Sequence, residues 1–476
     1  MPALILVLLL VLLPAASASA AGGGFGDGTA ISVDTPVSVP VGDFNEDGRA
    51  DLVAVSNTTG YVYVRLGRAD GGFTEEPPTQ VGGSYLSQAV AGDFTGDGEE
   101  DLAVASFVND KVHILTGLGD GGLIVGETIT LDRHPTSLLV GDFNADGKED
   151  LAIQNEKSGL GSQLSIRLGT GVGTFTSVPD KAVKGEALAI SDFNSDQKED
   201  LVFGDGGTPA GGVLLGTGTG AFNAGADIAL QGFAGISRSW VTADFNGDGN
   251  QDIAASLHDK AQVSVRLGKG DGTFGGGPDL PVGTKPGALA TGDVDGDGDQ
   301  DLVVANFGSG TVRVWQGGGA GDFVSYGDLP VGKEPVELAL ADFDGDGVDD
   351  LAVANAGSGV TVHRGLATPA LTGNLLVNGG FEGERAGGAA DDSPDIPGWE
   401  ASGLMTFMRY GSASHAYMPS VADSPRFGTG GSSFLWGGKS TATGGVTAAA
   451  QTVDVAAAGA SIDAGRATAG LSAYLG

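Results

Sequence analysis

A ten-residue acidic segment recurs seven times in this chain, and its period constrains the fold more than any other feature of the sequence. The copies begin at Asp43, Asp93, Asp142, Asp192, Asp244, Asp293 and Asp342. They read DFNEDGRADL, DFTGDGEEDL, DFNADGKEDL, DFNSDQKEDL, DFNGDGNQDI, DVDGDGDQDL and DFDGDGVDDL. Consecutive copies start 49 to 52 residues apart, a period that indicates an array of repeated supersecondary units.

The oxygen-bearing residues of each copy have the spacing of a loop that wraps around a hard cation. Side-chain oxygens at positions 1, 3, 5 and 9, with the main-chain carbonyl of position 7, can supply the six to eight oxygens, at about 2.3–2.6 Å, that Ca²⁺ prefers. Glycine at position 6 permits the sharp turn. We therefore expect up to seven structural Ca²⁺ ions. The expected ligands are Asp43, Asn45, Asp47, Arg49 and Asp51; Asp93, Thr95, Asp97, Glu99 and Asp101; Asp142, Asn144, Asp146, Lys148 and Asp150; Asp192, Asn194, Asp196, Lys198 and Asp200; Asp244, Asn246, Asp248, Asn250 and Asp252; Asp293, Asp295, Asp297, Asp299 and Asp301; Asp342, Asp344, Asp346, Val348 and Asp350.

An alternative is that the Asp and Asn residues only accept hydrogen bonds from nearby backbone amides. Three or four carboxylates are concentrated in each loop, and this favours a cation because like charges repel without a counter-ion. The copies are unequal. Thr95 stands at position 3 of the second loop, and Gln197 replaces glycine at position 6 of the fourth. We expect the fourth loop to bind calcium most weakly, since Gln in the left-handed conformation costs about 1 kcal/mol or more.

Short strands with alternating or wholly apolar patterns fill the rest of each repeat. The acidic loop leads into an apolar strand such as residues 351–354, a second strand such as Tyr61 to Leu66 follows, and a glycine-rich turn such as GKGDGTF, ending at Phe274, comes next. Each unit thus holds about four strands and no helical stretch. The sequence predicts an all-β protein built as a β-propeller.

The pairing of DFNGDG-x-x-DL with a downstream G-x-G-D-G-x-F resembles the FG-GAP and VCBS repeats of integrin α-subunit propellers and of many secreted bacterial proteins. This resemblance covers roughly residues 24–366 and implies a seven-bladed propeller with calcium in the loops. The departures are Gln197, Thr95 and Leu123. The seventh repeat ends near Gly365 without its own glycine-rich turn. We therefore expect residues 25–40 to complete the sheet of residues 350–364, which removes two exposed sheet edges.

The two ends of the chain differ from the repeats. Residues 1–20 have an apolar run followed by Ala-x-Ala sites, the pattern of a secretory signal peptide; a membrane anchor is the alternative. We therefore divide the chain into the signal peptide, a propeller over residues 21–366, a linker at 367–373 and a further module at 374–476. The opening of this last module, NLLVNGGFE followed by PGW, resembles secreted β-sandwich modules of the jelly-roll type, some of which bind carbohydrate, and we expect the module to be incomplete.

The composition of the chain limits the partners it can bind and the means by which its turns are fixed. The net charge of −36 argues against a nucleic-acid partner, because phosphate binding needs clustered Lys and Arg. The chain has no Cys, so calcium is the natural means of fixing the glycine-rich turns. After cleavage of the signal peptide we expect no membrane span, and a secreted or cell-surface location.

No catalytic arrangement is evident. His113, His134, His258, His363 and His415 show no zinc-binding spacing, and no nucleophile elbow or phosphate loop occurs. Recurrent arginines at 65, 167 and 266 favour strand-end salt bridges over a binding face. The four tryptophans favour buried packing over stacking on sugars; they are Trp240, Trp315, Trp399 and Trp436.

The sequence thus favours a non-enzymatic, exported adhesion or binding scaffold for an extracellular protein or glycan. Two alternatives remain open. One is a lectin that binds sugars between blades. The other is an accessory part of an enzyme that degrades polysaccharide or phospholipid, which rests on fold-level analogy alone.

Overall fold

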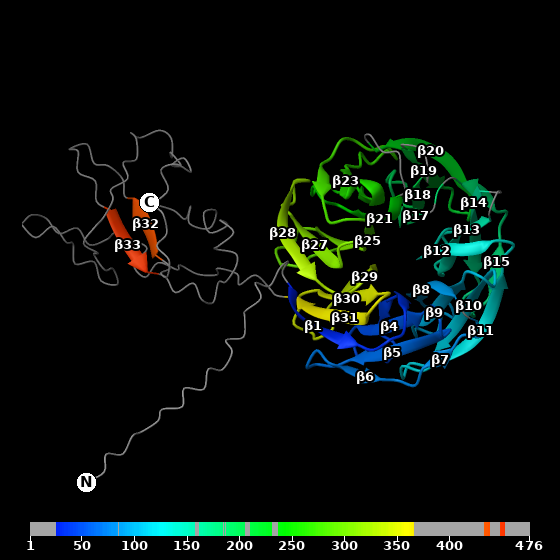
Figure 1. Cartoon of the computed structure of the whole chain (residues 1–476). Helices are drawn as coiled ribbons and strands as arrows, with labels where there is room; N and C mark the ends of the chain where they lie inside the picture. Colours follow the sequence, from blue (N-terminus) through cyan, green and yellow to red (C-terminus); the bar gives the residue numbers. More distant parts are fainter. Residues whose placement is uncertain are drawn as a thin grey trace, which may run out of the picture. The chain divides into compact units, whose positions relative to one another are not determined.

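The computed structural model describes residues 25–365, apart from 84, 158–160, 184, 186, 205–209 and 231–236, and the backbone of residues 433–437 and 448–452. The chain separates into two compact units, Met1–Ala367 and Thr368–Gly476. In the first unit, seven antiparallel sheets are arranged in a ring (Figure 1). The predicted all-β, seven-bladed propeller is therefore confirmed.

The blades, numbered by their acidic loops, contain the following strands. Blade 1 has β2 (Pro36–Ser38), β3 (Val41–Gly42), β4 (Asp51–Ser56), β5 (Tyr61–Gly67), β6 (Phe73–Glu75) and β7 (Thr79–Gln80). Blade 2 has β8 (Leu86–Gly92), β9 (Asp101–Ser106), β10 (Lys111–Gly117) and β11 (Leu123–Thr130). Blade 3 has β12 (His134–Gly141), β13 (Asp150–Lys157), β14 (Gly161–Gly169), β15 (Phe175–Ser177) and β16 (Lys181–Val183). Blade 4 has β17 (Ala187–Ser191), β18 (Asp200–Gly204), β19 (Ala210–Gly216) and β20 (Phe222–Ala229).

Blade 5 has β21 (Ser237–Ala243), β22 (Asp252–Leu257), the short 3₁₀ turn η1 (His258–Lys260), β23 (Gln262–Arg266) and β24 (Asp279–Pro281). Blade 6 has β25 (Pro286–Gly292), β26 (Asp301–Asn306), β27 (Thr311–Gly317) and β28 (Phe323–Pro330). Blade 7 has β29 (Pro335–Ala341), β30 (Asp350–Asn355), β31 (Gly359–Gly365) and, from the other end of the chain, β1 (Phe25–Ile31).

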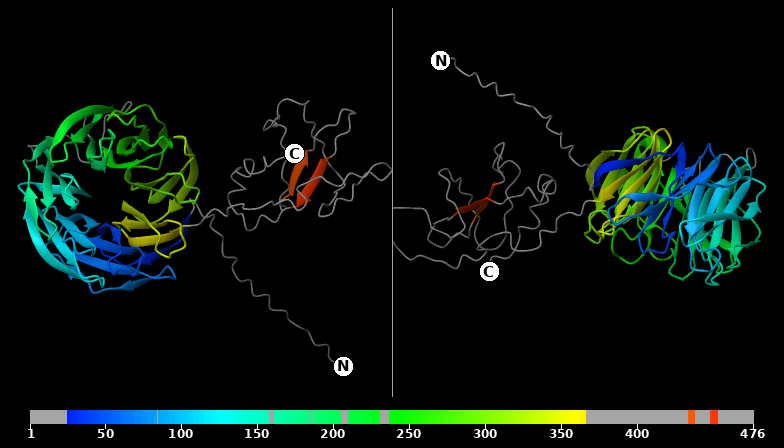
Figure 2. Two further views of the ribbon diagram at one scale, coloured as in Figure 1. Left: turned by 180° about the vertical axis from the view of Figure 1, so that it is seen from behind. Right: turned by 90° about the horizontal axis from the view of Figure 1, so that it is seen from below.

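The first strand of each blade lies innermost, against the first strands of the neighbouring blades (Figures 1 and 2). The second strands are buried along their whole length, as β9, β26 and β30 illustrate. Their runs of Leu, Val and Ala have no polar face because each blade is covered by a neighbour on both sides. Apolar clusters accordingly span adjacent blades; one of them joins Val53 and Val64 of blade 1 to Leu102 and Val104 of blade 2.

The ring is closed by pairing the two ends of the propeller chain. Strand β1 lies antiparallel to β31, with Phe25 opposite Gly365 and Ile31 opposite Val360. In Figure 1 the blue β1 lies beside the yellow strands of blade 7. The expected closure is therefore confirmed for residues 25–31. It was too broad for residues 36–38, because β2 pairs with β4 and belongs to blade 1.

Little of the second unit is described. Strands β32 (Ser433–Gly437) and β33 (Ala448–Thr452) pair antiparallel, with Leu435 opposite Ala450. The predicted signal peptide, the linker and the rest of the predicted β-sandwich lie outside the described residues. Within the described part of the chain, no helix has the length and apolar character needed to cross a membrane.

Candidate metal centre

Each acidic loop connects the first and second strands of its blade. Position 1 follows the innermost strand, and position 9 is the first residue of the second strand, as Asp51 begins β4. The glycine-rich turn joins the third strand to the outermost strand. Because the strands alternate in direction, the acidic loop and the glycine-rich turn lie at the same end of the blade.

The aspartate at position 9 is buried and fixes the loop to the third strand. One oxygen of Asp150 accepts the Gly169 N–H at 2.7 Å, and the other accepts the Phe143 N–H at 3.0 Å. All seven loops repeat this pattern, except that Thr95 supplies the second N–H in loop 2. Burial raises the pKa of Asp150 to about 6, although both hydrogen bonds act to lower it.

Glycine at the end of the third strand is required by this arrangement. A Cβ built on Gly169 would lie 2.1 Å from the carbonyl oxygen of Glu149, and one on Gly216 would lie 2.1 Å from that of Glu199. No side chain fits there, so the N–H can approach the position-9 carboxylate only from glycine.

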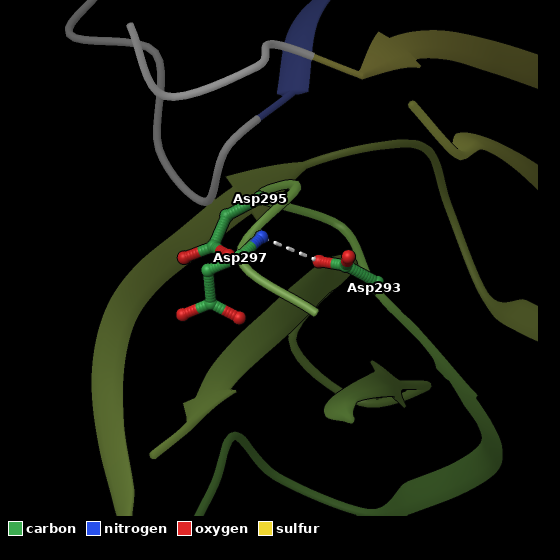
Figure 3. A group of neighbouring side chains, drawn as sticks. All are labelled: Asp293, Asp295 and Asp297. Carbon is green, nitrogen blue, oxygen red and sulfur yellow. Dashed lines mark hydrogen bonds between the residues drawn. The ribbon is translucent and has the colours of Figure 1, made fainter. Parts of the chain in front are cut away.

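The other carboxylates are oriented by the loop's own backbone. In loop 6 an oxygen of Asp293 accepts the N–H of Asp297 at 3.1 Å (Figure 3). The other oxygen of Asp293 accepts the N–H of Gly298 at 2.9 Å, and Asp297 accepts the N–H of Asp299. Equivalent bonds from positions 5, 6 and 7 occur in every loop. The aspartates therefore do accept hydrogen bonds from nearby backbone amides, as the alternative interpretation predicts. The same hydrogen bonds fix the orientation of the carboxylate oxygens.

Two loops bring three carboxylates together. Oxygens of Asp293, Asp295 and Asp297 in loop 6, and of Asp342, Asp344 and Asp350 in loop 7, lie within 4.8 Å of one another. These are the loops with four acidic ligands. Among the described residues, no trio of carboxylates in the other five loops is this close. The donor set is entirely oxygen, which suits Ca²⁺ rather than a softer metal.

Basic side chains compete for the ligand at position 5 in three loops. Lys198 Nζ lies 3.0 Å from Asp196 and Lys148 Nζ lies 3.7 Å from Asp146, while Arg49 pairs with Asp47. In loop 7, Arg364 lies 3.5 Å from Asp344. The position-7 residues Arg49, Lys148 and Lys198 were predicted to contribute only main-chain carbonyls, and their side-chain role was missed.

Gln197 occupies the left-handed region that glycine occupies in the other loops. Its φ is 63°, against 78° for Gly147, and its N–H bonds Asp192 as glycine would. The structure thus retains the strained geometry on which the prediction of a weak fourth loop depends.

A contact between blades was not predicted. The Phe at position 2 packs edge to face on the Phe that ends the glycine-rich turn of the next blade, as Phe143 does on Phe222 with ring centroids 5.7 Å apart. The Phe143 carbonyl also accepts the Gly220 N–H from that turn at 2.8 Å. Both departures from phenylalanine occur in such pairings: Phe44 shares a cluster with Leu123, and Val294 shares one with Phe25. Comparing position 2 of each acidic loop with the last residue of the glycine-rich turn in the following repeat would have revealed this pairing from the sequence.

The remaining predictions concern residues outside the loops. The three arginines form strand-end ion pairs as expected: Arg65 with Glu75 at 3.7 Å, Arg167 with Asp180 at 3.3 Å, and Arg266 with Asp279 at 3.2 Å. Trp240 and Trp315 are buried as expected, whereas His415, Trp399 and the Trp436 side chain lie outside the described residues. None of the described histidines joins a metal-binding group.

A cavity of about 570 Å³ lies among the innermost strands. The first halves of these strands, which lie away from the acidic loops, form most of its wall. The lining residues include Gln88, Ser239, Trp240, His258 and Glu337. A smaller pocket of about 210 Å³ lies between blades 3 and 4, beside Asp180 and Phe222.

Solved structures support the fold and are distant in sequence. A protein of Lactobacillus plantarum is 12% identical over 65% of this chain and 89% of its own, with a TM-score of 0.52. A candidate 6-phosphogluconolactonase of Bacteroides fragilis is 15% identical over 65% and 88%, with a TM-score of 0.52. BBS1N in complex with ARL6DN is 14% identical over 73% and 99%, with a TM-score of 0.53. A search of curated proteins finds no match.

The sequence pattern of the FG-GAP-like repeat matches five segments, at residues 43–104, 93–153, 192–255, 244–304 and 293–353. Together they include all seven acidic loops and more than half of the chain. The chain therefore belongs to the FG-GAP-like repeat family.

Proposed function

We propose that the protein is an exported, non-catalytic binding scaffold whose propeller is held in shape by Ca²⁺ in its acidic loops. The observation that carries this proposal is the convergence of three carboxylates within 4.8 Å in loops 6 and 7. Such crowding is unfavourable without a counter-ion. The ion would neutralise the loop and hold positions 1, 3 and 5 against the aspartate that begins the second strand.

The calcium role is tested on the full chain by thermal unfolding. We expect excess EDTA to lower Tm and added Ca²⁺ to restore it, because an ion that binds only the folded state stabilises it. Mg²⁺ should restore Tm less well, since it demands a tighter octahedral site. An unchanged melting curve in EDTA would refute the structural role of calcium.

The proposed partner is an extracellular protein or glycan. A cavity of about 570 Å³ is within the range of small-ligand sites, and Ser239 and Gln88 in its wall offer the hydroxyl and amide groups that suit a neutral sugar. The pocket between blades 3 and 4, at about 210 Å³, falls below that range. A glycan therefore fits the cavity among the innermost strands, on the axis of the ring, better than the pocket between blades 3 and 4.

A glycan and extracellular-protein binding screen, with and without Ca²⁺, tests the partner. We expect any glycan bound on the axis to be lost in Gln88→Ala or Ser239→Ala but retained in Asp180→Ala, which alters the pocket between blades. Protein binding insensitive to all three variants would indicate an outer surface instead.

A further inference from the structure

The seven blade interfaces fall into two classes at the acidic loops. We call the residue before each loop position 0. In four interfaces position 0 is glycine and position 8 of the next blade's loop is acidic; the pairs are Gly42 with Glu100, Gly92 with Glu149, Gly141 with Glu199, and Gly292 with Asp349. In the other three both residues differ; the pairs are Ser191 with Gln251, Ala243 with Gln300, and Ala341 with Ala50. Glycine and the carboxylate thus occur together or not at all.

The structure gives the reason for this pairing. A Cβ built on Gly92 would lie 2.1 Å from Oε2 of Glu149, and one on Gly141 would lie 2.1 Å from Oε2 of Glu199. At Gly292 the distance to Oδ2 of Asp349 would be 2.6 Å. The carboxylate of one blade therefore occupies the space that a side chain at position 0 of the preceding blade would fill.

These carboxylates lie beside the first metal ligand of the preceding loop. Glu199 lies against Gly141, the residue immediately before Asp142, and Glu149 lies against Gly92, the residue immediately before Asp93. Each is also repelled by the side-chain charge of the same aspartate. Glu100 and Asp349 are placed in the same way, against Gly42 and Gly292, which immediately precede Asp43 and Asp293.

The pairs contain orphaned buried oxygens. Oε2 of Glu149 and Oε2 of Glu199 are shielded from solvent and accept no hydrogen bond from the described part of the chain. Neither oxygen therefore has a donor in the described part of the chain, although each carboxyl is repelled by a neighbouring aspartate. A divalent cation held by the position-1 aspartate would relieve this repulsion.

We propose that Glu100, Glu149, Glu199 and Asp349 are affinity-determining residues for calcium in loops 1, 2, 3 and 6, each acting across a blade interface. This rests on the proposed calcium function. Calcium in one of these loops attracts the carboxylate of the next blade and fastens the two blades together. Without calcium, the same carboxylate repels the loop and loosens the interface. Loops 4, 5 and 7 lack this coupling.

The test is Glu199→Gln in the full chain, because Gln is the natural occupant at positions 251 and 300. A chelator-competition titration should show that one site loses about tenfold in calcium affinity, the effect typical of residues that support metal ligands. The calcium-free Tm should rise, and the increase in Tm caused by calcium should shrink. If Glu199 only fills the space beside Gly141, Gln fills it equally well, and neither quantity changes.

Two further variants assign the effect to its loop. In an Asp142→Asn background, loop 3 loses its first ligand charge, so Glu199→Gln should no longer alter the titration. Conversely, Gln300→Glu with Ala243→Gly should raise the affinity of one site, since it builds the missing pair beside loop 5. Gln300→Glu alone should not, because the Ala243 Cβ occupies the space.

The outcomes separate the two proposals. If the unaltered protein shows no calcium-dependent change in Tm or in the titration, the calcium role itself fails. If the unaltered protein binds calcium and Glu199→Gln has the same affinities and the same calcium-free Tm, the cross-blade role alone is overturned.

Discussion

Backbone conformation at a single loop position distinguishes the fourth loop from the other six. Position 6 has a positive φ in every loop, between 63° at Gln197 and 92° at Gly98. Glycine adopts this region without a steric penalty, whereas any residue with a Cβ is strained there. Gln197 nevertheless donates its N–H to Asp192 at 2.7 Å, so the loop closes at the expense of strain.

Gln197→Gly should therefore stabilise the protein. We expect the free energy of unfolding to rise by about 1 kcal/mol, and the weakest calcium site to gain affinity, because the loop no longer stores strain. Denaturant unfolding and a calcium titration measure the two effects. The matched control is Gly147→Gln, which should produce the opposite changes in loop 3. Equal stability of Gln197→Gly and the unaltered protein would contradict the argument.

At this scale the sequence predicts which residues form the loops, but not all of what they bind. Spacing alone places Asp150 among metal ligands. Its hydrogen bond to Gly169 connects residues on different strands, and its partner becomes evident only when the third strand is paired with the second. The ion pair of Lys198 with Asp196 was likewise invisible to an argument that considered only the carbonyl at position 7.

The innermost strands are joined by side chains that reach the backbone of the next blade. Ser38 accepts the Ala89 N–H at 3.0 Å, Gln88 accepts the Leu138 N–H at 2.8 Å, and Glu337 accepts the Val39 N–H at 2.8 Å. These acceptors stand five residues before their loops. The contact that joins the last blade to the first therefore uses a carboxylate where the others use neutral groups.

Glu337 makes the stability of the ring depend on pH. Burial raises its pKa to about 7, although hydrogen bonds from Ser38 and from the Val39 N–H act to lower it. A carboxyl whose pKa is raised on folding stabilises the fold fully below its unfolded value of 4.5, and this contribution is lost as pH rises to about 7. The protein should therefore be more stable at pH 5 than at pH 8 through this group.

Glu337→Gln isolates the effect, because its amide oxygen can still accept the Val39 N–H. We expect the variant to be more stable than the unaltered protein at pH 8, by on the order of 1–3 kcal/mol, and to lose that advantage near pH 5. Unfolding at saturating Ca²⁺ keeps the loop carboxylates occupied during the comparison. Parallel pH profiles of the two proteins would show that Glu337 is not responsible.

The strands were predicted well because each repeat supplies the same alternation seven times. The contacts between blades were not, since they join residues about 50 positions apart that no local pattern connects. Thus Phe143 was seen as part of a motif, but its packing on Phe222 depends on the ring that brings successive blades together.

For the propeller as a whole, the sequence predicted a closed ring because the seventh repeat ends near Gly365 without its own glycine-rich turn. The structure identifies the residue that makes the closure specific. Phe25 lies opposite Gly365, just as Phe323 lies opposite Gly317 in blade 6, so it takes the place of the phenylalanine that ends the other glycine-rich turns. It packs in one cluster with Val294, the only position-2 residue of the seven loops that is not phenylalanine.

Phe25→Ala should open the ring at this one interface. The side chain is fully buried, and loss of a buried phenylalanine costs about 3–5 kcal/mol. Because β1 is joined covalently to blade 7 at neither of its ends, this loss should free β1 from β31, so that hydrogen exchange accelerates at the amides of both strands. The matched control is Phe222→Ala, which removes the equivalent phenylalanine of blade 4, where β20 follows β19 directly in the chain. That variant should lower Tm without selective exchange in β31. Faster exchange in β31 in both variants, or in neither, would contradict a closure held by Phe25.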